Sequence, residues 1–229
     1  MKKLCYTAII GKYDYLKEPL VVSRNWDYIC FTDRQDLESN YWKIIQIDNP
    51  QSLENTRLAR QIKILGQPLL EQYNQTIWID GNVRLKCDPD KFLIDYNFDS
   101  DIMLSWHHGR SCIYDEAKAC IKLNKDSEQV INNHMQRYRD ENFPKQFGLV
   151  QTGIIARENN NRTKEFCKNW WNELERGSKR DQLSFNYVLW KDKDIKVKTI
   201  NPNIFQSEYF QLFNHTPFKR KLKKRYRRA

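Results

Sequence analysis

The sequence is poor in glycine and proline, with seven of each among 229 residues. This scarcity excludes a collagen-like repeat, and it also excludes the flexible linkers and low-complexity arrays that these residues dominate. No apolar run approaches the roughly 20 residues that a membrane-spanning helix needs. With 40% apolar and 13% aromatic residues, the chain instead has the composition of a globular domain with a sizeable core.

Signature motifs of several enzyme classes are also absent. The sequence contains no G-x-x-x-x-G-K-[ST] and no G-x-G-x-x-G, which argues against a P-loop enzyme and a standard dinucleotide fold. It contains no G-x-S-x-G and no H-E-x-x-H, so the elbow of a serine hydrolase and the helix of a zinc peptidase are both missing.

The six cysteines are scattered and form no C-x-x-C pair. This spacing predicts reduced, buried thiols in a cytoplasmic protein and favours neither disulfides nor a zinc site. Lys2 and Lys3 precede the apolar run LCYTAII, as in a signal peptide. However, the run is short and no small-residue cleavage site follows it, so we expect a buried first strand.

The net charge of +10 arises mainly at one end of the chain. Residues 218–229, FKRKLKKRYRRA, hold eight basic residues and no acidic one. Removing these eight from the 39 basic residues leaves 31 against 29 acidic residues, a net charge of +2. A nearly neutral body argues against nucleic acid as a partner. Phe218, Leu222 and Tyr226 recur every fourth residue, which favours an amphipathic segment on an anionic membrane over the alternative of a solvated tail.

Strand-like and helix-like segments alternate along residues 4–200. The expected strands are 4–10, 28–33, 42–47, 76–80, 101–106, 148–157 and 195–200. The expected helices are 53–73, 114–140 in one or two pieces, 161–176 and 181–191. This alternation predicts an α/β fold with a central, mostly parallel sheet flanked by helices.

Two expected strands end on an aspartate, at Asp33 and at Asp80. In open α/β sheets, ligands bind at the carboxyl ends of the strands. In WIDGN, Gly81 permits a tight turn and Asn82 offers a second oxygen, so Asp80 and Asn82 could hold a hard cation such as Mg²⁺ or Mn²⁺. The alternative is an ordinary β-turn, because Asp-Gly and Gly-Asn pairs are common in turns.

Two further segments combine charged residues with a helix. Arg57, Arg60 and Lys63 fall near one side of the 53–73 helix, where they could neutralise a diphosphate or simply form a solvated face. Asp181 opens the last expected helix, between Arg180 and Gln182. It could be a helix cap, or it could act with Gln182 to orient a hydroxyl-bearing substrate.

The segment HHGRSCIYDEA follows directly from an expected strand. Its adjacent His107 and His108 point in different directions, which argues against a shared metal. Asp115 and Glu116 are candidate general bases. His215, just before the basic tail, is either structural or a ligand.

Together these segments resemble a glycosyltransferase-like family, formerly a domain of unknown function, whose plant members are linked to turgor regulation and seed mucilage. The matching segments appear in family order over residues 4–190. They are YTAIIGKYDYL, CFTD, ARQIKIL, IWIDGN, HHGRSCIYDEA, GLVQTGIIAR and RDQLSF. The resemblance implies a single GT-A-like domain that binds a nucleotide-sugar, usually with a divalent metal.

The resemblance also implies roles for individual residues. The residues expected to border the nucleotide are Tyr6, Thr7, Gly11, Tyr13 and Asp14. Asp33 would contact the base or ribose, and Arg60 and Lys63 would meet the diphosphate. Asp80 and Asn82 would stand in for a D-x-D metal motif, with His215 completing the metal shell. The candidate catalytic residues are Asp181, Gln182, Arg180 and Glu116.

The resulting hypothesis is a glycosyltransferase domain over residues 1–217 with a basic tail over 218–229. Its donor would be a nucleotide-sugar, with UDP as the favoured nucleotide, and its metal Mn²⁺ or Mg²⁺. Its acceptor would be a bacterial surface glycan or a lipid-linked glycan. We expect it in the cytoplasm, with a peripheral position at the inner membrane face as a variant. The alternatives are a metal-dependent hydrolase of a lipid amide and a non-catalytic module that binds anionic surfaces.

Overall fold

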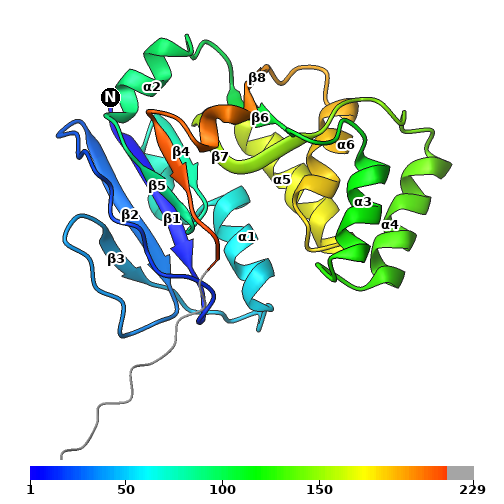
Figure 1. Ribbon diagram of the computed structural model, residues 1–229, viewed down its shortest axis with the longest axis horizontal. Coiled ribbons are helices and arrows are strands. Elements are labelled where there is room, and N and C mark those ends of the chain that lie inside the picture. The colour runs from blue at the N-terminus through cyan, green and yellow to red at the C-terminus, as the bar shows by residue number, and fades with distance from the viewer. Residues whose placement is uncertain (216–229) are drawn as a thin grey trace, which may run out of the picture.

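The computed structural model describes residues 1–215, and the basic tail lies outside them. A seven-stranded sheet has the order β3-β2-β1-β4-β7-β6-β8 (Figure 1). Its strands are β1 (Lys3–Ile9), β2 (Trp26–Thr32), β3 (Lys43–Gln46), β4 (Gln75–Ile79), β6 (Ile102–Trp106), β7 (Val150–Glu158) and β8 (Val197–Ile200). A two-stranded sheet pairs β5 (Val83–Leu85) with β9 (Phe210–Leu212).

Only β7 runs against the other six strands of the large sheet. It is antiparallel to β4 on one side and to β6 on the other. The first residues of β7 therefore lie at the edge where β1 and β4 end. The predicted α/β fold with a mostly parallel sheet is confirmed.

Alternating side chains of the strands fill two cores, one on each face of the sheet. Leu4 and Tyr6 of β1 point into the larger core, and Cys5 and Ile9 point into the other. The helices over the larger core are α1 (Asn55–Leu65), α3 (Ile113–Lys122), α4 (Glu128–Asp140), α5 (Asn161–Arg176) and α6 (Gln182–Lys191). The opposite face is covered by α2 (Pro89–Asp95), the 3-10 helix η2 (Pro202–Phe205) and the small sheet.

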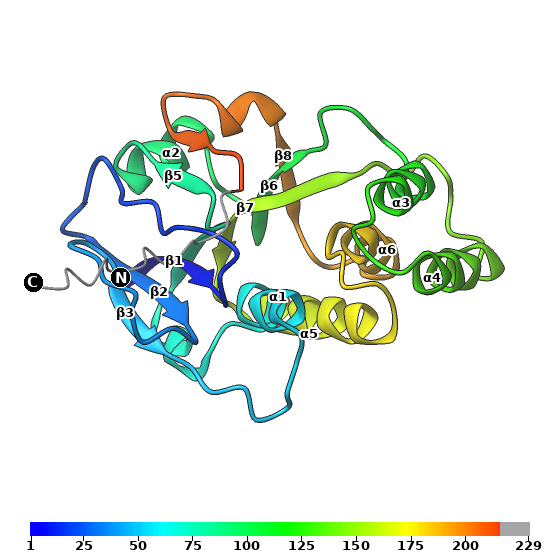
Figure 2. The same cartoon turned by 60° about the horizontal axis from the view of Figure 1, so that its bottom comes forward.

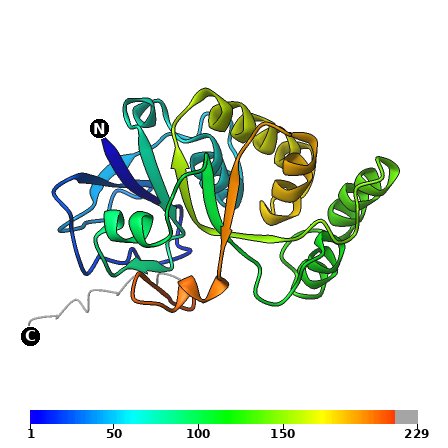
Figure 3. The same ribbon diagram turned by 90° about the horizontal axis from the view of Figure 1, so that it is seen from above.

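Figure 2 shows α1 and α5 side by side against the sheet. Figures 1 and 3 place the α3–α4 hairpin at the end of the molecule farthest from β3. No helix within residues 1–215 is long and apolar enough to cross a membrane.

The expected helix at 53–73 is shorter in the structure, because α1 ends at Leu65. Gly66 adopts a left-handed φ of 74°, which favours glycine and breaks the helix, and the 3-10 helix η1 (Pro68–Gln72) follows. The region 114–140 forms two helices, α3 and α4. The short elements α2, β5 and β9 were not predicted. The strands β5 and β9 have only three residues each, and strands of that length carry almost no periodic signal.

Candidate active site

A cavity of about 740 Å³ opens at the edge where the parallel strands end. Its walls come from the ends of β1 and β4, the first two turns of α1, the start of β7 and the residues that precede α6. The α3–α4 loop and the last described residues complete the wall. The site therefore lies where ligands bind in open α/β sheets.

Asp80 follows directly from β4 and lines this cavity. Its Oδ1 atom accepts hydrogen bonds from Trp78 Nε1 at 2.8 Å and from Lys63 Nζ at 3.3 Å. Its Oδ2 atom makes no hydrogen bond or ion pair within residues 1–215 and remains available to a ligand. A Cβ atom at Gly153 would lie 3.4 Å from this oxygen and 2.8 Å from Phe205, so glycine keeps the approach open.

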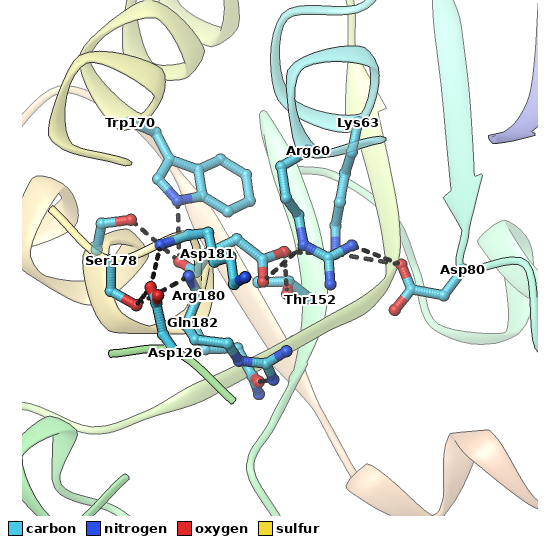
Figure 4. A network of polar contacts seen from close by, with 12 residues as sticks. Arg60, Lys63, Asp80, Asp126, Thr152, Trp170, Ser178, Arg180, Asp181 and Gln182 are labelled. Atoms are coloured by element: carbon cyan, nitrogen blue, oxygen red, sulfur yellow. Dashed lines mark hydrogen bonds and ion pairs between the residues drawn. The ribbon is translucent and has the colours of Figure 1, made fainter. Parts of the chain in front are cut away.

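Asp181 is buried at the centre of a network of polar contacts (Figure 4). Lys63 Nζ lies 2.6 Å from one carboxylate oxygen, Arg60 Nε lies 3.2 Å from the other, and the Thr152 hydroxyl donates a hydrogen bond at 2.8 Å. Burial alone would raise the pKa of Asp181, but the positive charges of Arg60 and Lys63 outweigh it and hold that pKa far below its usual range. Asp181 occupies the N-cap position of α6, but its side chain makes no capping hydrogen bond to that helix, so the interpretation of this carboxylate as a helix cap is wrong.

Arg60 and Lys63 lie one turn apart on α1, and both face Asp80 and Asp181. Arg60 lines the cavity, whereas Lys63 has no exposed surface and does not. The expected solvated face is therefore wrong for Lys63, and so is its direct contact with a diphosphate. Its role is to hold the two aspartates in place. Arg57 donates to the carbonyls of Leu174 and Gly177, each at 2.8 Å, and so ties α1 to the end of α5.

Tyr13, Asp14 and His215 form another part of the cavity wall. His215 Nδ1 lies 2.6 Å from Asp14 Oδ2, and the His215 ring packs against Tyr13 with centroids 4.7 Å apart. Tyr13 is 60% exposed, so much of its side chain is open to a ligand. The structure thus brings together three residues that the resemblance placed near the nucleotide and the metal.

The resemblance also placed Tyr6, Thr7, Gly11 and Asp33 near the nucleotide, and the structure keeps all four out of the cavity lining. Tyr6 and Thr7 are buried, so the expectation that their side chains border a ligand there is wrong. Asp33 is exposed and accepts a hydrogen bond from the Gly11 amide at 2.8 Å. It fixes the turn that carries Tyr13.

Glu116 belongs to a separate cluster outside the cavity lining. Arg110 Nε lies 2.5 Å from its carboxylate and His107 Nε2 lies 3.7 Å away. Because Glu116 is buried and already paired, the expectation that it serves as a general base in this cavity is wrong. His108 does not line the cavity, but its Nδ1 atom lies 3.0 Å from Nε2 of Gln151, which does.

The residues expected to hold a metal lie on the cavity but are not gathered into a preformed shell. Asn82 donates from its amide to the carbonyl of Phe213 at 2.8 Å, and His215 is held by Asp14. Within residues 1–215, no group of three or more His, Cys, Asp or Glu side chains could hold a metal ion. Mg²⁺ is nevertheless commonly bound by one or two carboxylates with substrate phosphates. Asp80 Oδ2 and the Asn82 amide oxygen fit an ion of that kind.

Comparison with known protein families shows to which of them the chain belongs. The profile of the TOD1/MUCI70, glycosyltransferase-like domain matches residues 2–217. The chain belongs to this family. The TOD1/MUCI70 domain thus spans every residue that lines the cavity, from the end of β1 to His215.

Two Arabidopsis thaliana proteins are similar to this member of the TOD1/MUCI70 family. One, named probable hexosyltransferase MUCI70, is 26% identical over 222 residues, which cover 84% of this chain and 37% of the relative. The other, named alkaline ceramidase TOD1, is 22% identical over 241 residues, covering 90% and 51%. The chain therefore spans about a third to a half of these relatives. A solved structure of the bifunctional glycosyltransferase WbbM has a TM-score of 0.47 at 12% identity, covering 87% of this chain and 38% of that one.

Sequence reasoning missed several residues of the site. Near the start of β7, Thr152 donates a hydrogen bond to Asp181, and Gly153 leaves space beside Asp80. The sequence marked this place by the polar pair Gln-Thr, which interrupts the apolar run GLVQTGIIAR. Lys125 and Lys179 also line the cavity, but isolated surface lysines carry no pattern that marks them.

Proposed function

We propose that this chain transfers a sugar from a nucleoside diphosphate sugar to a glycan or lipid-linked glycan, such as a bacterial surface polysaccharide. The observation that carries the proposal is the charge network at the end of the sheet. There Arg60 and Lys63 join Asp80 to Asp181 beside the cavity. The chain also belongs to a glycosyltransferase-like family. Cations held in this way can neutralise the charge that develops on a leaving diphosphate.

The donor would lie between the end of β1 and the start of α1. Tyr13 presents an exposed aromatic face to the base, and Arg60 presents its guanidinium to the diphosphate. Asp181 and Asp80 keep Arg60 in place, and this preorganisation avoids the cost of ordering a flexible side chain during the reaction. When bound, a divalent metal held by Asp80 and Asn82, with His215 in reach of the same cavity, would further stabilise the leaving group as a Lewis acid.

Asp181 serves as a positioning residue in this proposal and not as the base. A general base works best when its pKa lies near the operating pH, whereas Arg60 and Lys63 hold the pKa of Asp181 far below that range. Gln182 and Arg180, next along the chain, face the cavity and are available to the sugar or the acceptor.

The direct test is release of nucleoside diphosphate from a panel of nucleotide-sugars with Mn²⁺, with ceramide hydrolysis assayed in parallel. Sugar-dependent release of UDP or a related diphosphate supports the proposal. Hydrolysis of ceramide without any such release would support the activity named for TOD1 instead, and binding of anionic surfaces without either activity would support a non-catalytic module.

Asp80 allows a sharper version of this test by calorimetry. We expect Asp80→Ala to abolish metal-dependent binding of UDP while the protein stays folded, since the substitution removes the one carboxylate oxygen left unpaired at the end of β4. The matched control is Asp115→Ala, an exposed carboxylate outside the cavity, which should bind UDP as the unmodified chain does. Unchanged UDP affinity in Asp80→Ala would show that the assignment of Asp80 is wrong.

A further inference from the structure

The cavity extends past Asp181, away from the side proposed for the donor. Figure 4 shows Asp80 on one side of Arg60 and Lys63, and Arg180 and Gln182 on the other. The wall of this second side comes from the α3–α4 loop and the residues just before α6. Three of its side chains, Lys125, Lys179 and Arg180, are basic.

The acidic residues of the cavity all have partners. Asp181 and Asp80 share Lys63, at 2.6 Å and 3.3 Å, and Asp14 contacts His215 at 2.6 Å. By contrast, neither Lys125 nor Arg180 forms an ion pair within residues 1–215. The second side of the cavity therefore carries two basic side chains that form no direct ion pair with a carboxylate of the described chain, although the charge of Arg180 also acts on neighbouring Asp181.

The structure also fixes the two segments that carry these cations. Asp126 accepts hydrogen bonds from the Ser178 hydroxyl at 2.6 Å and from the Lys179 amide at 2.9 Å, which fastens the α3–α4 loop to the segment before α6. The guanidinium of Arg180 is oriented by Gln182, at 3.3 Å. The Lys179 side chain turns away from this pair to Glu54, at 2.9 Å, and so leaves the second side to Lys125 and Arg180.

We propose that Lys125 and Arg180 form an anion subsite for the acceptor, which would carry a phosphate or a carboxylate beside the hydroxyl that receives the sugar. This inference rests on the proposed function and specifies the substrate class. The donor diphosphate faces Arg60 on the first side, so the charges of the second side remain for another ligand. Lysine and arginine suit both phosphate and carboxylate, and arginine can bind either through two parallel hydrogen bonds.

The test is calorimetry on the full chain with saturating UDP and Mg²⁺, so that the donor side is filled. The probes are glucose 1-phosphate, methyl glucuronide and neutral methyl glucoside. We expect one or both anionic sugars to bind about tenfold more tightly than methyl glucoside, as one charge-assisted contact would give. A preference for glucose 1-phosphate indicates a phosphate-linked acceptor, and a preference for methyl glucuronide indicates an acidic glycan.

Lys125→Glu should remove the preference and leave UDP affinity unchanged. The matched control is Lys122→Glu, an exposed lysine in the last turn of α3 that does not line the cavity, and it should retain the preference. Equal binding of charged and neutral sugars, no sugar binding at all, or an unaltered preference in Lys125→Glu would overturn the inference. Failure of UDP itself to bind would instead count against the proposed function.

Discussion

Lys63 is a fully buried cation at the centre of the site. Its ammonium group has no exposed surface and contacts two carboxylates from distant parts of the chain. A buried ion pair contributes little net stability compared with apolar residues, but removing one partner strands the other charge in a medium of low polarity. The residue therefore connects the integrity of the fold with the position of Asp80 and Asp181.

We expect Lys63→Met to lower the free energy of unfolding by roughly 3 to 5 kcal/mol, because Asp181 then keeps only Arg60 as an ionic partner. The double variant Lys63→Met with Asp181→Asn should lose clearly less than the sum of the two single losses, since no buried carboxylate is left unpaired. Urea denaturation of the four proteins measures both quantities. Additive losses would mean that the two residues are not coupled.

At the scale of elements, a buried histidine joins α4 to the turn between α5 and α6. His134 Nδ1 accepts a hydrogen bond from the Ser178 amide at 3.1 Å, so its proton resides on Nε2 and is donated to the Tyr138 hydroxyl at 2.7 Å. A Cβ atom at Gly177 would lie 2.5 Å from the imidazole ring, so this contact also requires glycine. The turn that it fixes leads directly to Asp181.

This contact makes stability depend on pH. Burial, together with the charge of nearby Arg137, lowers the pKa of His134 to about 3 in the folded protein, against about 6.5 when unfolded. Its contribution is thus fully present above pH 6.5 and is lost as pH falls from 6.5 toward 3, by up to roughly 5 kcal/mol in all.

The measurement is the difference in unfolding free energy between the unmodified chain and His134→Gln from pH 7 to pH 5. Between pH 7 and pH 5, we expect the unfolding free energy of the unmodified chain to fall by about 2 kcal/mol more than that of His134→Gln, since glutamine has no proton to gain. Parallel curves would show that His134 is protonated alike in both states.

At the scale of the whole molecule, the concentration of basic charge in residues 218–229 leads us to expect attachment to an anionic membrane. The basic residues 218–229 follow shortly after His215, which itself lies on the cavity wall beside Tyr13. Attachment of this segment to an anionic membrane would place the cavity near a lipid-linked acceptor. Each basic residue near such a surface is worth about 1 kcal/mol.

We therefore expect the full chain to sediment with anionic liposomes at low salt and residues 1–217 to remain in solution. Neutral phosphatidylcholine liposomes are the control, and neither protein should bind them. Equal sedimentation of both proteins with anionic liposomes would exclude the tail as the attachment.

Much of the fold followed from local patterns. Apolar runs located the seven strands of the large sheet, and α5 spans the expected residues 161–176. Prediction failed where local signals were weak or ambiguous. Gly66 stopped α1 early, and β5 and β9 form only because they pair with each other. The side chains of Tyr6 and Glu116 belong to segments that match the family, yet packing buries both away from the cavity.

The sequence by itself determined the fold class, the identity of the charged residues at strand and helix ends, and the concentration of basic charge in the tail. These depend on residue types and their spacing along the chain. Only the tertiary structure decided that Lys63 meets both Asp80 and Asp181, because those contacts span 17 and 118 positions and depend on the sheet order. It also decided which cations of the cavity lack a carboxylate partner within residues 1–215, since burial and pairing are properties of packing and not of sequence.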